Sequence, residues 1–366
     1  MSTGRGMMIP VARVGDSTRI VEQALSFEPP ERMPVFETIW PEWAAKWRAE
    51  RGLDQSADVL DYFPLDLAVC AALEAPCVTH RRVLEDDGDA VVADDGWGRR
   101  TLTRRSGFFC HVIDRDLKEK SDLDRLTFDP VNLDVRFETF DREVAGARAA
   151  GKPVFVKIGG LYNRCAMLRG EAEFLMDLVS DPEFARALIE RLAEHELQLG
   201  LEVLRRADAY AQGVWIFDDM CNQRSPMFSP AIFESMFLPV YQSIIGRLKA
   251  VGARRVFLHS DGNLGPLLDL VVEAGFNGIN PVERRTGLIV EELLPRYFGR
   301  LSFIGGVCNS VILPRGTERE IRRHVETLID AGRLGGLVMG THSIAPDIPV
   351  ANYELYRSIV KAYRRH

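Results

Sequence analysis

Short, uninterrupted apolar runs recur along the 366-residue chain, and most of them are followed by a long amphipathic segment. Continuous rather than alternating apolar runs are typical of parallel strands that are buried on both faces. Because parallel strands need long crossover connections, the amphipathic segments are predicted to be helices. The eight predicted strands are Val35–Glu37, Leu65–Val69, Val154–Ile158, Gly213–Phe217, Arg255–Leu258, Gly278–Asn280, Leu301–Ile304 and Gly336–Met339.

Three helix starts support this alternation of strands and helices. Asp181 and Ser229 each precede a proline and are predicted N-caps, and Thr317 is the predicted N-cap of a third helix. The pattern predicts an α/β fold, a (β/α)8 TIM barrel in which residues 1–366 form a single domain. The rival is a doubly wound sheet, which would usually bring a GxGxxG motif after an early strand; the sequence has no such motif.

Residues 81–112 break this pattern. The turn sequences Asp-Gly-Asp at 87–89 and Asp-Gly-Trp-Gly at 95–98 separate short β-like pieces. The segment is too short for an independent domain. We predict a β-hairpin insertion after the second barrel strand, covering part of the barrel mouth.

Composition narrows the class of protein. The chain is 46% hydrophobic and 27% charged, as expected for a globular protein with a sizeable core, and its net charge of −7 disfavours a nucleic-acid partner. Its six cysteines include no CxxC pair, which indicates reduced thiols. No apolar run approaches the roughly 18 residues of a membrane span, and the N-terminus lacks the apolar core of a signal peptide. We therefore expect a cytoplasmic protein without membrane segments.

Polar residues follow five of the predicted strands. In a β/α barrel, catalytic groups come from the carboxyl ends of several strands. Each residue alone has a structural explanation: a histidine can be a hydrogen-bonded core group, an aspartate a turn residue or helix cap, and a cysteine a packing residue. Their convergence on one rim favours a functional site. The residues are Asp218 and Asp219, His259 and Asp261, Asn280 and Glu283, Cys308 and Asn309, and His342.

A divalent metal explains the most prominent of these groups. His259 and Asp261 occupy alternate positions at one strand end, and His342 follows the last strand, so only a closed barrel would bring the three together. Two imidazoles and a carboxylate suit a catalytic Zn²⁺ with one position left for substrate. They equally suit Fe²⁺ or Mn²⁺, so the ligand types leave the metal open.

Several motifs together resemble the uroporphyrinogen decarboxylase superfamily, which includes decarboxylases and cobalamin-dependent methyltransferases. The resemblance covers nearly the whole chain and implies a β/α barrel. The motifs are Ala-Leu-Ser-Phe-Glu-Pro-Pro-Glu-Arg at 24–32, Gly-Leu-Tyr-Asn-Arg-Cys at 160–165, Phe-Asp-Asp-Met at 217–220, Ser-Pro-Ala-Ile-Phe at 229–233, His-Ser-Asp-Gly-Asn at 259–263, Ile-Asn-Pro at 279–281, and Thr-His-Ser-Ile-Ala-Pro-Asp at 341–347.

One departure from the family pattern separates this chain from true uroporphyrinogen decarboxylases. Those enzymes carry an N-terminal Arg-Gln-Ala-Gly-Arg segment that grips the propionates of the porphyrinogen. This chain instead has Phe-Glu-Thr-Ile-Trp-Pro-Glu-Trp at 36–43, with no basic pair. The resemblance is therefore closer to the cobalamin-dependent methyltransferase-like branch.

A second departure concerns the metal ligands. In the methyltransferase branch a His-x-Cys pair after strand five and a further Cys after strand eight hold zinc. His259 matches the first ligand, whereas Asp261 and His342 stand where the family has cysteines. Carboxylate and imidazole make the metal a stronger Lewis acid than thiolates do, better suited to polarising an oxygen. We hypothesise that a methyl group moves between a methoxy or hydroxyl oxygen of a small, aromatic substrate and a corrinoid.

The remaining strand-end residues receive roles in this hypothesis. Asp219 and Glu283, with Asp218, are the candidate acid, base or additional metal ligand. The candidate substrate-binding residues are Trp40, Glu37, Phe217, Arg224 and Asn280, and the rings of Trp40, Trp43 and Phe217 would form apolar walls.

Two other functions stay open. One is a decarboxylase or lyase of a small acid, in which the metal or Arg224 binds a carboxylate; the other is a non-catalytic barrel that binds a corrinoid or small ligand. The sequence has no Asp-x-His-x-x-Gly segment, so a corrinoid would come on a partner protein. Homodimers occur in the superfamily, and the sequence leaves the oligomeric state open.

Overall fold

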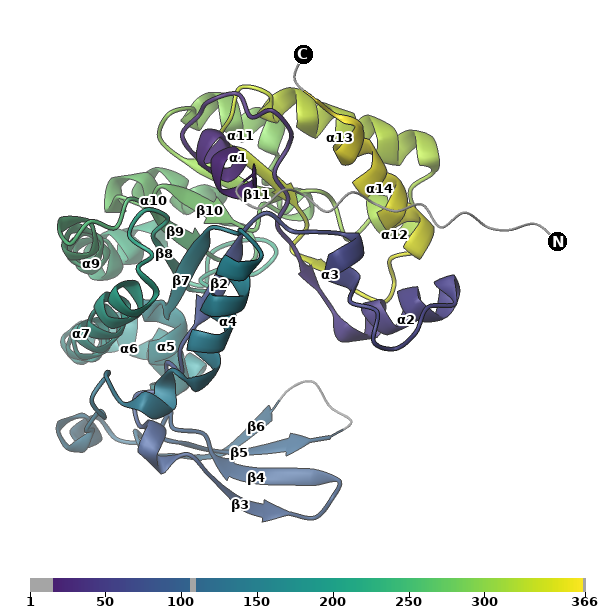
Figure 1. Cartoon of the computed structure of the whole chain (residues 1–366). Helices are drawn as coiled ribbons and strands as arrows, with labels where there is room; N and C mark the ends of the chain where they lie inside the picture. Colours follow the sequence, from purple (N-terminus) through teal and green to yellow (C-terminus); the bar gives the residue numbers. More distant parts are fainter. Residues whose placement is uncertain (1–15, 106–109, 365–366) are drawn as a thin grey trace. The chain divides into compact units, whose positions relative to one another are not determined.

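The computed structural model describes residues 16–105 and 110–364. The N-terminal segment considered above for a signal peptide lies largely outside these residues. The fold is α/β, and its parallel sheet is that of a β/α barrel, as predicted (Figure 1). The strand order is β12-β11-β10-β9-β8-β7-β2. The strands are β2 (Ala68–Ala71), β7 (Val154–Gly159), β8 (Val214–Phe217), β9 (Val256–His259), β10 (Gly278–Asn280), β11 (Ser302–Gly306) and β12 (Leu337–Gly340).

The first predicted strand, Val35–Glu37, forms only a single parallel bridge, between Val35 and Met339 of β12. The amide of Val35 donates to the Asp66 carboxylate at 2.9 Å, and Pro34 has no amide to donate, so this segment cannot form a regular ladder. A short strand β1 (Thr38–Ile39) lies just beyond it and pairs with β13 (Ser343–Ile344).

Helices separate the strands along the chain (Figure 1). All three predicted N-caps are confirmed: the side chains of Asp181, Ser229 and Thr317 accept hydrogen bonds from the amides of Phe184, Ile232 and Glu320. The helices are α1 (Asp16–Leu25), α2 (Pro41–Arg51), α3 (Val59–Tyr62), α4 (Glu138–Ala149), α5 (Leu161–Arg169), α6 (Glu171–Ser180), α7 (Pro182–Ala207), α8 (Pro230–Ile232), the π-helical turn Phe233–Phe237, α9 (Leu238–Ala250), α10 (Leu268–Ala274), α11 (Val290–Tyr297), α12 (Ile312–Arg315), α13 (Glu318–Gly332) and α14 (Val350–Ala362).

The chain divides into two compact units. Unit 1 comprises Met1–Ala68, Ala147–Pro153 and Asn280–His366, and unit 2 comprises Val69–Gly146 and Val154–Ile279. The prediction of a single domain over residues 1–366 stays a prediction.

The predicted insertion of unit 2 is antiparallel β structure and follows β2, as expected. It is larger than a hairpin, since four strands pair in the order β3-β4-β5-β6 (Figure 1). We call this the insertion sheet. Residues 106–109 of the predicted segment lie outside the described residues. The turn between β4 and β5 carries Trp97, whose ring lies 5.4 Å from the Arg164 guanidinium of α5. The strands are β3 (Arg82–Asp86), β4 (Ala90–Asp94), β5 (Arg99–Arg104) and β6 (Cys110–Arg115).

Side chains on one face of β7, β8 and β9 form two layers in unit 2. Successive side chains of a strand point to opposite faces, so residues two apart share a face. The first layer is aromatic: Phe155, Trp215 and Phe257 have ring centroids 5.4–6.2 Å apart. Two residues further along each strand, nearer its carboxyl end, stand Lys157, Phe217 and His259. The aromatic layer thus supports a layer that carries ionisable groups.

The other face of the same strands packs against helices. Ile158 of β7 illustrates this packing, since a Cβ added at Gly200 of α7 would lie 3.3 Å from its side chain. Among the described residues, no helix is long and apolar enough to cross a membrane.

Candidate metal centre

The carboxyl ends of β8 and β9 place three ionisable side chains together. The Nε2 atom of His259 lies 3.6 Å from Asp261 Oδ1 and 3.9 Å from Asp219 Oδ1. The amide of Asp261 donates to the same oxygen of Asp219 at 3.0 Å. Asp219 therefore connects the end of one strand to the end of the next and fixes the backbone of a candidate metal ligand.

Phe217 holds the His259 ring. The two rings stack with centroids 4.2 Å apart and an interplanar angle of 12°. Because His259 is buried and packed face-on against a rigid ring, its Nε2 atom has little freedom to turn away from the two carboxylates. Such support of a ligand by its neighbours is common at metal sites.

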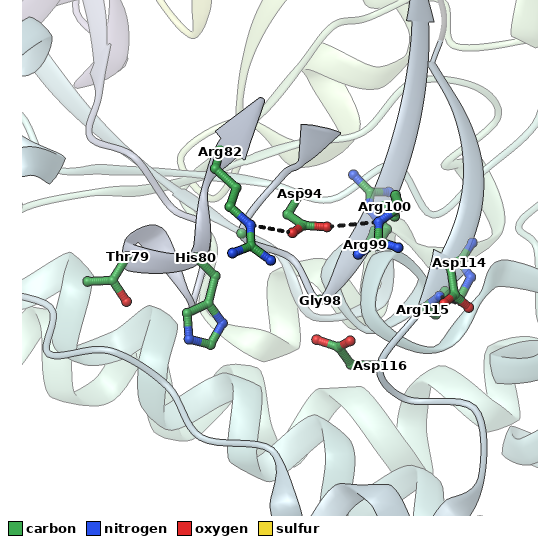
Figure 2. Close-up of a pocket in the computed structure, with 11 residues that line it drawn as sticks. Thr79, His80, Arg82, Asp94, Gly98, Arg99, Arg100, Asp114, Arg115 and Asp116 are labelled. Atoms are coloured by element: carbon green, nitrogen blue, oxygen red, sulfur yellow. Dashed lines mark hydrogen bonds and ion pairs between the residues drawn. The ribbon is translucent and has the colours of Figure 1, made fainter. Parts of the chain in front are cut away.

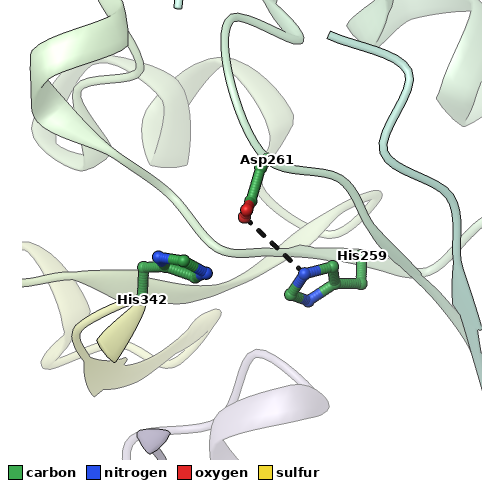
Figure 3. A group of neighbouring side chains, drawn as sticks. All are labelled: His259, Asp261 and His342. Carbon is green, nitrogen blue, oxygen red and sulfur yellow. Dashed lines mark ion pairs between the residues drawn. The ribbon is translucent and has the colours of Figure 1, made fainter. Parts of the chain in front are cut away.

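His342 is the third predicted ligand and follows β12. One ligand atom from each of His259, Asp261 and His342 lies within 4.8 Å of those of the other two (Figure 3). The three side chains form a group that could hold a metal ion.

The donor chemistry of this group fits a divalent cation. Ligand atoms about 2.0–2.2 Å from one tetrahedral ion are about 3.3–3.6 Å apart. The separation of His259 Nε2 from Asp261 Oδ1 is 3.6 Å, which is already in that range. Histidine nitrogen and carboxylate oxygen suit Zn²⁺, Fe²⁺ and Mn²⁺, so the identity of the metal stays a prediction.

Asp218 has different surroundings from its neighbour Asp219. It is fully buried, and its oxygens accept hydrogen bonds from the Tyr241 hydroxyl at 2.5 Å and from the amides of Tyr162 and Asn163 at 3.0 and 2.6 Å. Burial raises the pKa of Asp218 to about 6. These contacts tie β8 to the first turn of α5. They support a structural role, whereas the predicted catalytic role stays untested.

Glu37 is buried in a side-chain network of unit 1. Its carboxylate accepts hydrogen bonds from Tyr353 at 2.9 Å, from Arg357 at 3.1 Å and from Thr341 at 3.3 Å. Burial raises its pKa, and the Arg357 charge opposes that rise. The network joins α14 to the residues around β1 and β12. A carboxylate with three donors is poorly placed to select a substrate, so the substrate-binding role of Glu37 stays a prediction without support from its contacts.

The remaining predicted residues have varied surroundings. The side-chain amide of Asn280 donates to the carbonyl of Ile304 at 3.1 Å, and Glu283 forms an ion pair of 3.2 Å with Arg285. The residues of both interactions lie in unit 1. Arg224 is exposed in the loop after β8, Trp40 is half-buried at the start of α2, and Trp43 and Cys308 are buried. Their predicted roles stay predictions.

The sequence reading missed a charged cluster beside the centre in unit 2. Lys157 and Arg164 both pair with Glu74, and Glu196 accepts a hydrogen bond of 2.8 Å from the amide of Gly159. We call Glu74, Lys157, Arg164 and Glu196 the charged cluster. Its signal in the sequence is the lysine that interrupts the apolar run Val-Phe-Val-Lys-Ile-Gly of β7.

A separate pocket of about 410 Å³ lies on the insertion sheet (Figure 2). Four arginines and three aspartates line it, and Asp94 pairs with both Arg82 at 2.9 Å and Arg100 at 3.2 Å. Because these charges largely cancel, the pocket has no marked preference for an anion or a cation. None of the predicted site residues lines it.

The β/α barrel fold and the group His259, Asp261 and His342 are typical of an enzyme. The model for uroporphyrinogen decarboxylase (URO-D) matches residues 111–363, and the chain belongs to this family. A comparison with curated proteins finds no match. Among solved structures, the chain is similar to a methyltransferase from Methanosarcina mazei, at 16% sequence identity and a TM-score of 0.66 over 95% of this chain and 99% of that one. At this identity the likeness shows the shared fold.

Proposed function

We propose that this protein is a metal-dependent methyltransferase that moves a methyl group between a small, methoxylated substrate and the corrinoid of a partner protein. The observation that carries the proposal is the group formed by His259, Asp261 and His342. The fold shared with a methyltransferase supports it. A bound divalent metal would supply a Lewis acid that polarises a substrate oxygen.

The side chains of the chain itself would bind, orient and transfer a proton. His259, Asp261 and His342 would hold the metal, and Phe217 would fix the His259 ring and offer an apolar face to the substrate. Asp219 has one oxygen 3.9 Å from His259 Nε2 and is about a third exposed. It is therefore the best placed of the predicted acids to give a proton to the oxygen that loses its methyl group.

Metal content is the first test. After reconstitution with Zn²⁺ and removal of free metal, elemental analysis should find stoichiometric zinc in the wild type and little in the variants His259→Ala and His342→Ala. His111→Ala, which changes an exposed histidine of β6, is the matched control and should keep its zinc. Equal zinc in the wild type and His259→Ala would refute this centre.

Methyl transfer is the second test, with anisole and cob(I)alamin as probes. The methyl–oxygen bond breaks, a cobalt–carbon bond forms, and the phenolate takes up a proton, so phenol and methylcob(III)alamin should appear together. Formation of both by the zinc-loaded wild type, and not by His259→Ala, supports the proposal. The family also contains decarboxylases; release of CO₂ from benzoate without any cobalt methylation would favour that alternative.

A further inference from the structure

Lys157 is an unusual residue for the middle of a buried strand. It shares a face of β7 with Phe155, and its Nζ atom lies 4.7 Å from the centroid of the Phe217 ring. Phe217 in turn stacks on His259. A charge in a buried strand is costly unless it is paired or reaches solvent. The ammonium therefore needs an explanation, and it stands beside the candidate metal centre.

Glu74 and Arg164 hold this ammonium in place. One oxygen of Glu74 lies 3.1 Å from Lys157 Nζ, and the other lies 2.5 Å from Arg164 Nη2. Gly159 makes room for this arrangement, because a Cβ there would lie 2.5 Å from Arg164 Nε. Trp97 of the insertion sheet packs over the Arg164 guanidinium. The two cations thus share the Glu74 carboxylate.

The charges of the cluster do not cancel. Burial opposes the ionisation of Glu74, but Arg164 and Lys157 outweigh it and lower its pKa, so Glu74 is ionised at pH 7. Burial raises the pKa of Glu196 to about 8, and the Glu74 charge adds to this rise, so Glu196 is mainly neutral. Within the charged cluster, two cations thus face one ionised carboxylate. The Asp218 carboxylate, whose pKa is about 6, also interacts with Arg164, so Lys157 is the cation with the least compensation.

Lys157 is the charged group of the cluster that reaches solvent. Its side chain is 24% exposed, compared with 9% for Arg164 and 8% for Glu74, and Glu196 is 0% exposed. An ammonium has three N–H donors. Among residues 16–105 and 110–364, Glu74 is the only carboxylate that pairs with Lys157, so donors remain for a ligand.

We propose that Lys157, held by Glu74 and backed by Arg164, is an anion subsite that binds the carboxylate of a small substrate whose apolar part lies against Phe217. A single exposed ammonium matches a monoanion, whereas a phosphate dianion would keep one charge unpaired. The inference rests on the proposed function, because it adds that the substrate of the same site is a carboxylic acid.

Ligand binding tests the subsite without turnover. Benzoate is the probe, benzamide is its neutral counterpart, and isothermal titration calorimetry on the full chain at low salt gives the affinity. Benzoate should bind the wild type, and Lys157→Met should weaken binding about 10- to 100-fold, as expected for the loss of a charge-assisted hydrogen bond. Benzamide should bind weakly and equally to both proteins. Lys157→Arg should restore part of the affinity.

Two controls keep the result interpretable. Lys249→Met removes a lysine at the C-terminal end of α9, before β9 begins, and should leave benzoate binding unchanged. If Lys157→Met does not fold, as judged by circular dichroism, Lys157→Gln and the loss of wild-type affinity with rising salt provide the same information.

The outcomes separate this inference from the proposed function. No saturable binding of benzoate to the wild type, or equal binding to Lys157→Met, overturns the subsite. Zinc content should be the same in Lys157→Met and the wild type. Benzoate binding that depends on Lys157, found together with no methyl transfer, would keep the subsite and remove the methyltransferase proposal.

Discussion

Asp218 and Asp219 are neighbours in sequence, and the alternation of a strand sends their side chains to opposite faces. Trp215, Phe217 and Asp219 follow the inner face, which leads to His259, whereas Asp218 points toward α5 and α9. The sequence predicted a role for both residues because it placed both at a strand end. Side chains of a strand alternate between its two faces, and continuing this alternation just past the end of β8 already separates Asp218 from Asp219.

Asp219 gives the first prediction. Asp219→Asn should lower the zinc affinity about 10- to 100-fold, because Asp219 fixes the Asp261 backbone and adds negative charge 3.9 Å from His259 Nε2. Competition with a chromophoric chelator measures the affinity. Asp114→Asn, which changes an exposed aspartate of the insertion sheet, should have no effect. An unchanged affinity in Asp219→Asn would show that this carboxylate does not serve the centre.

Glu196 gives a prediction of pH dependence. Its pKa is raised to about 8 in the folded protein, from an ordinary value of 4.5, so the folded state binds more protons than the unfolded state between these values. The stabilising contribution of the protonated form is complete below about pH 4.5 and is lost as the pH rises through about 8.

Glu196→Gln should remove this loss, because glutamine is neutral at every pH. The free energy of unfolding of the wild type, relative to the variant, should fall by roughly 1 kcal/mol per pH unit within that window. Urea unfolding at several pH values measures it. A difference between the two proteins that is independent of pH would mean that Glu196 is ionised in the folded protein.

At the scale of the elements, the sequence predicted most of the fold. Six of the eight apolar runs form strands of the parallel sheet, and the three predicted caps begin helices. The second run, Leu65–Val69, shares only its last two residues with β2. These features are local, since a buried strand and a capped helix each carry their own pattern. The first run differs because Asp66, a residue distant in sequence, takes the amide of Val35. No local pattern contains that contact.

The charged cluster could not be predicted in full for the same reason. Lys157 was visible as a break in an apolar run, but its partners come from elsewhere: Glu74 follows β2, and Arg164 lies in α5. The pairing of Lys157 with Glu74 depends on the strand order, and the position of Arg164 depends on glycine at 159, because a Cβ there would lie 2.5 Å from Arg164 Nε. The metal group differs, because each of its three residues follows a predicted strand, so its position could be read from the sequence.

The hydrogen bonds from α5 to Asp218, which follows β8, give the prediction at this scale. Asp218 accepts two amide hydrogen bonds at the start of α5, so Asp218→Asn would direct an NH₂ group toward donors in a buried site. We expect a loss of roughly 2–4 kcal/mol in the free energy of unfolding. Urea unfolding of the metal-free protein measures it, and Asp219→Asn is the matched control with little expected change. Equal stability of the two variants would contradict the structural role of Asp218.

At the scale of the whole molecule, metal binding and folding stability are linked. His342 lies 81 residues after Asp261 (342 − 261), so the three ligands come together only in the folded chain, and zinc should bind the folded state much more tightly. Zinc at a hundred times its dissociation constant should then stabilise the protein by about 2.7 kcal/mol.

Thermal unfolding should show this linkage as a Tm that is a few degrees higher with Zn²⁺ than with a chelator. The increment should disappear in His259→Ala and equally in His342→Ala, because each variant removes a ligand of the same ion. His111→Ala should keep it. If His342→Ala retains the full increment while His259→Ala loses it, the ion is held by the ends of β8 and β9 alone, with Asp219 in place of His342 as the third ligand.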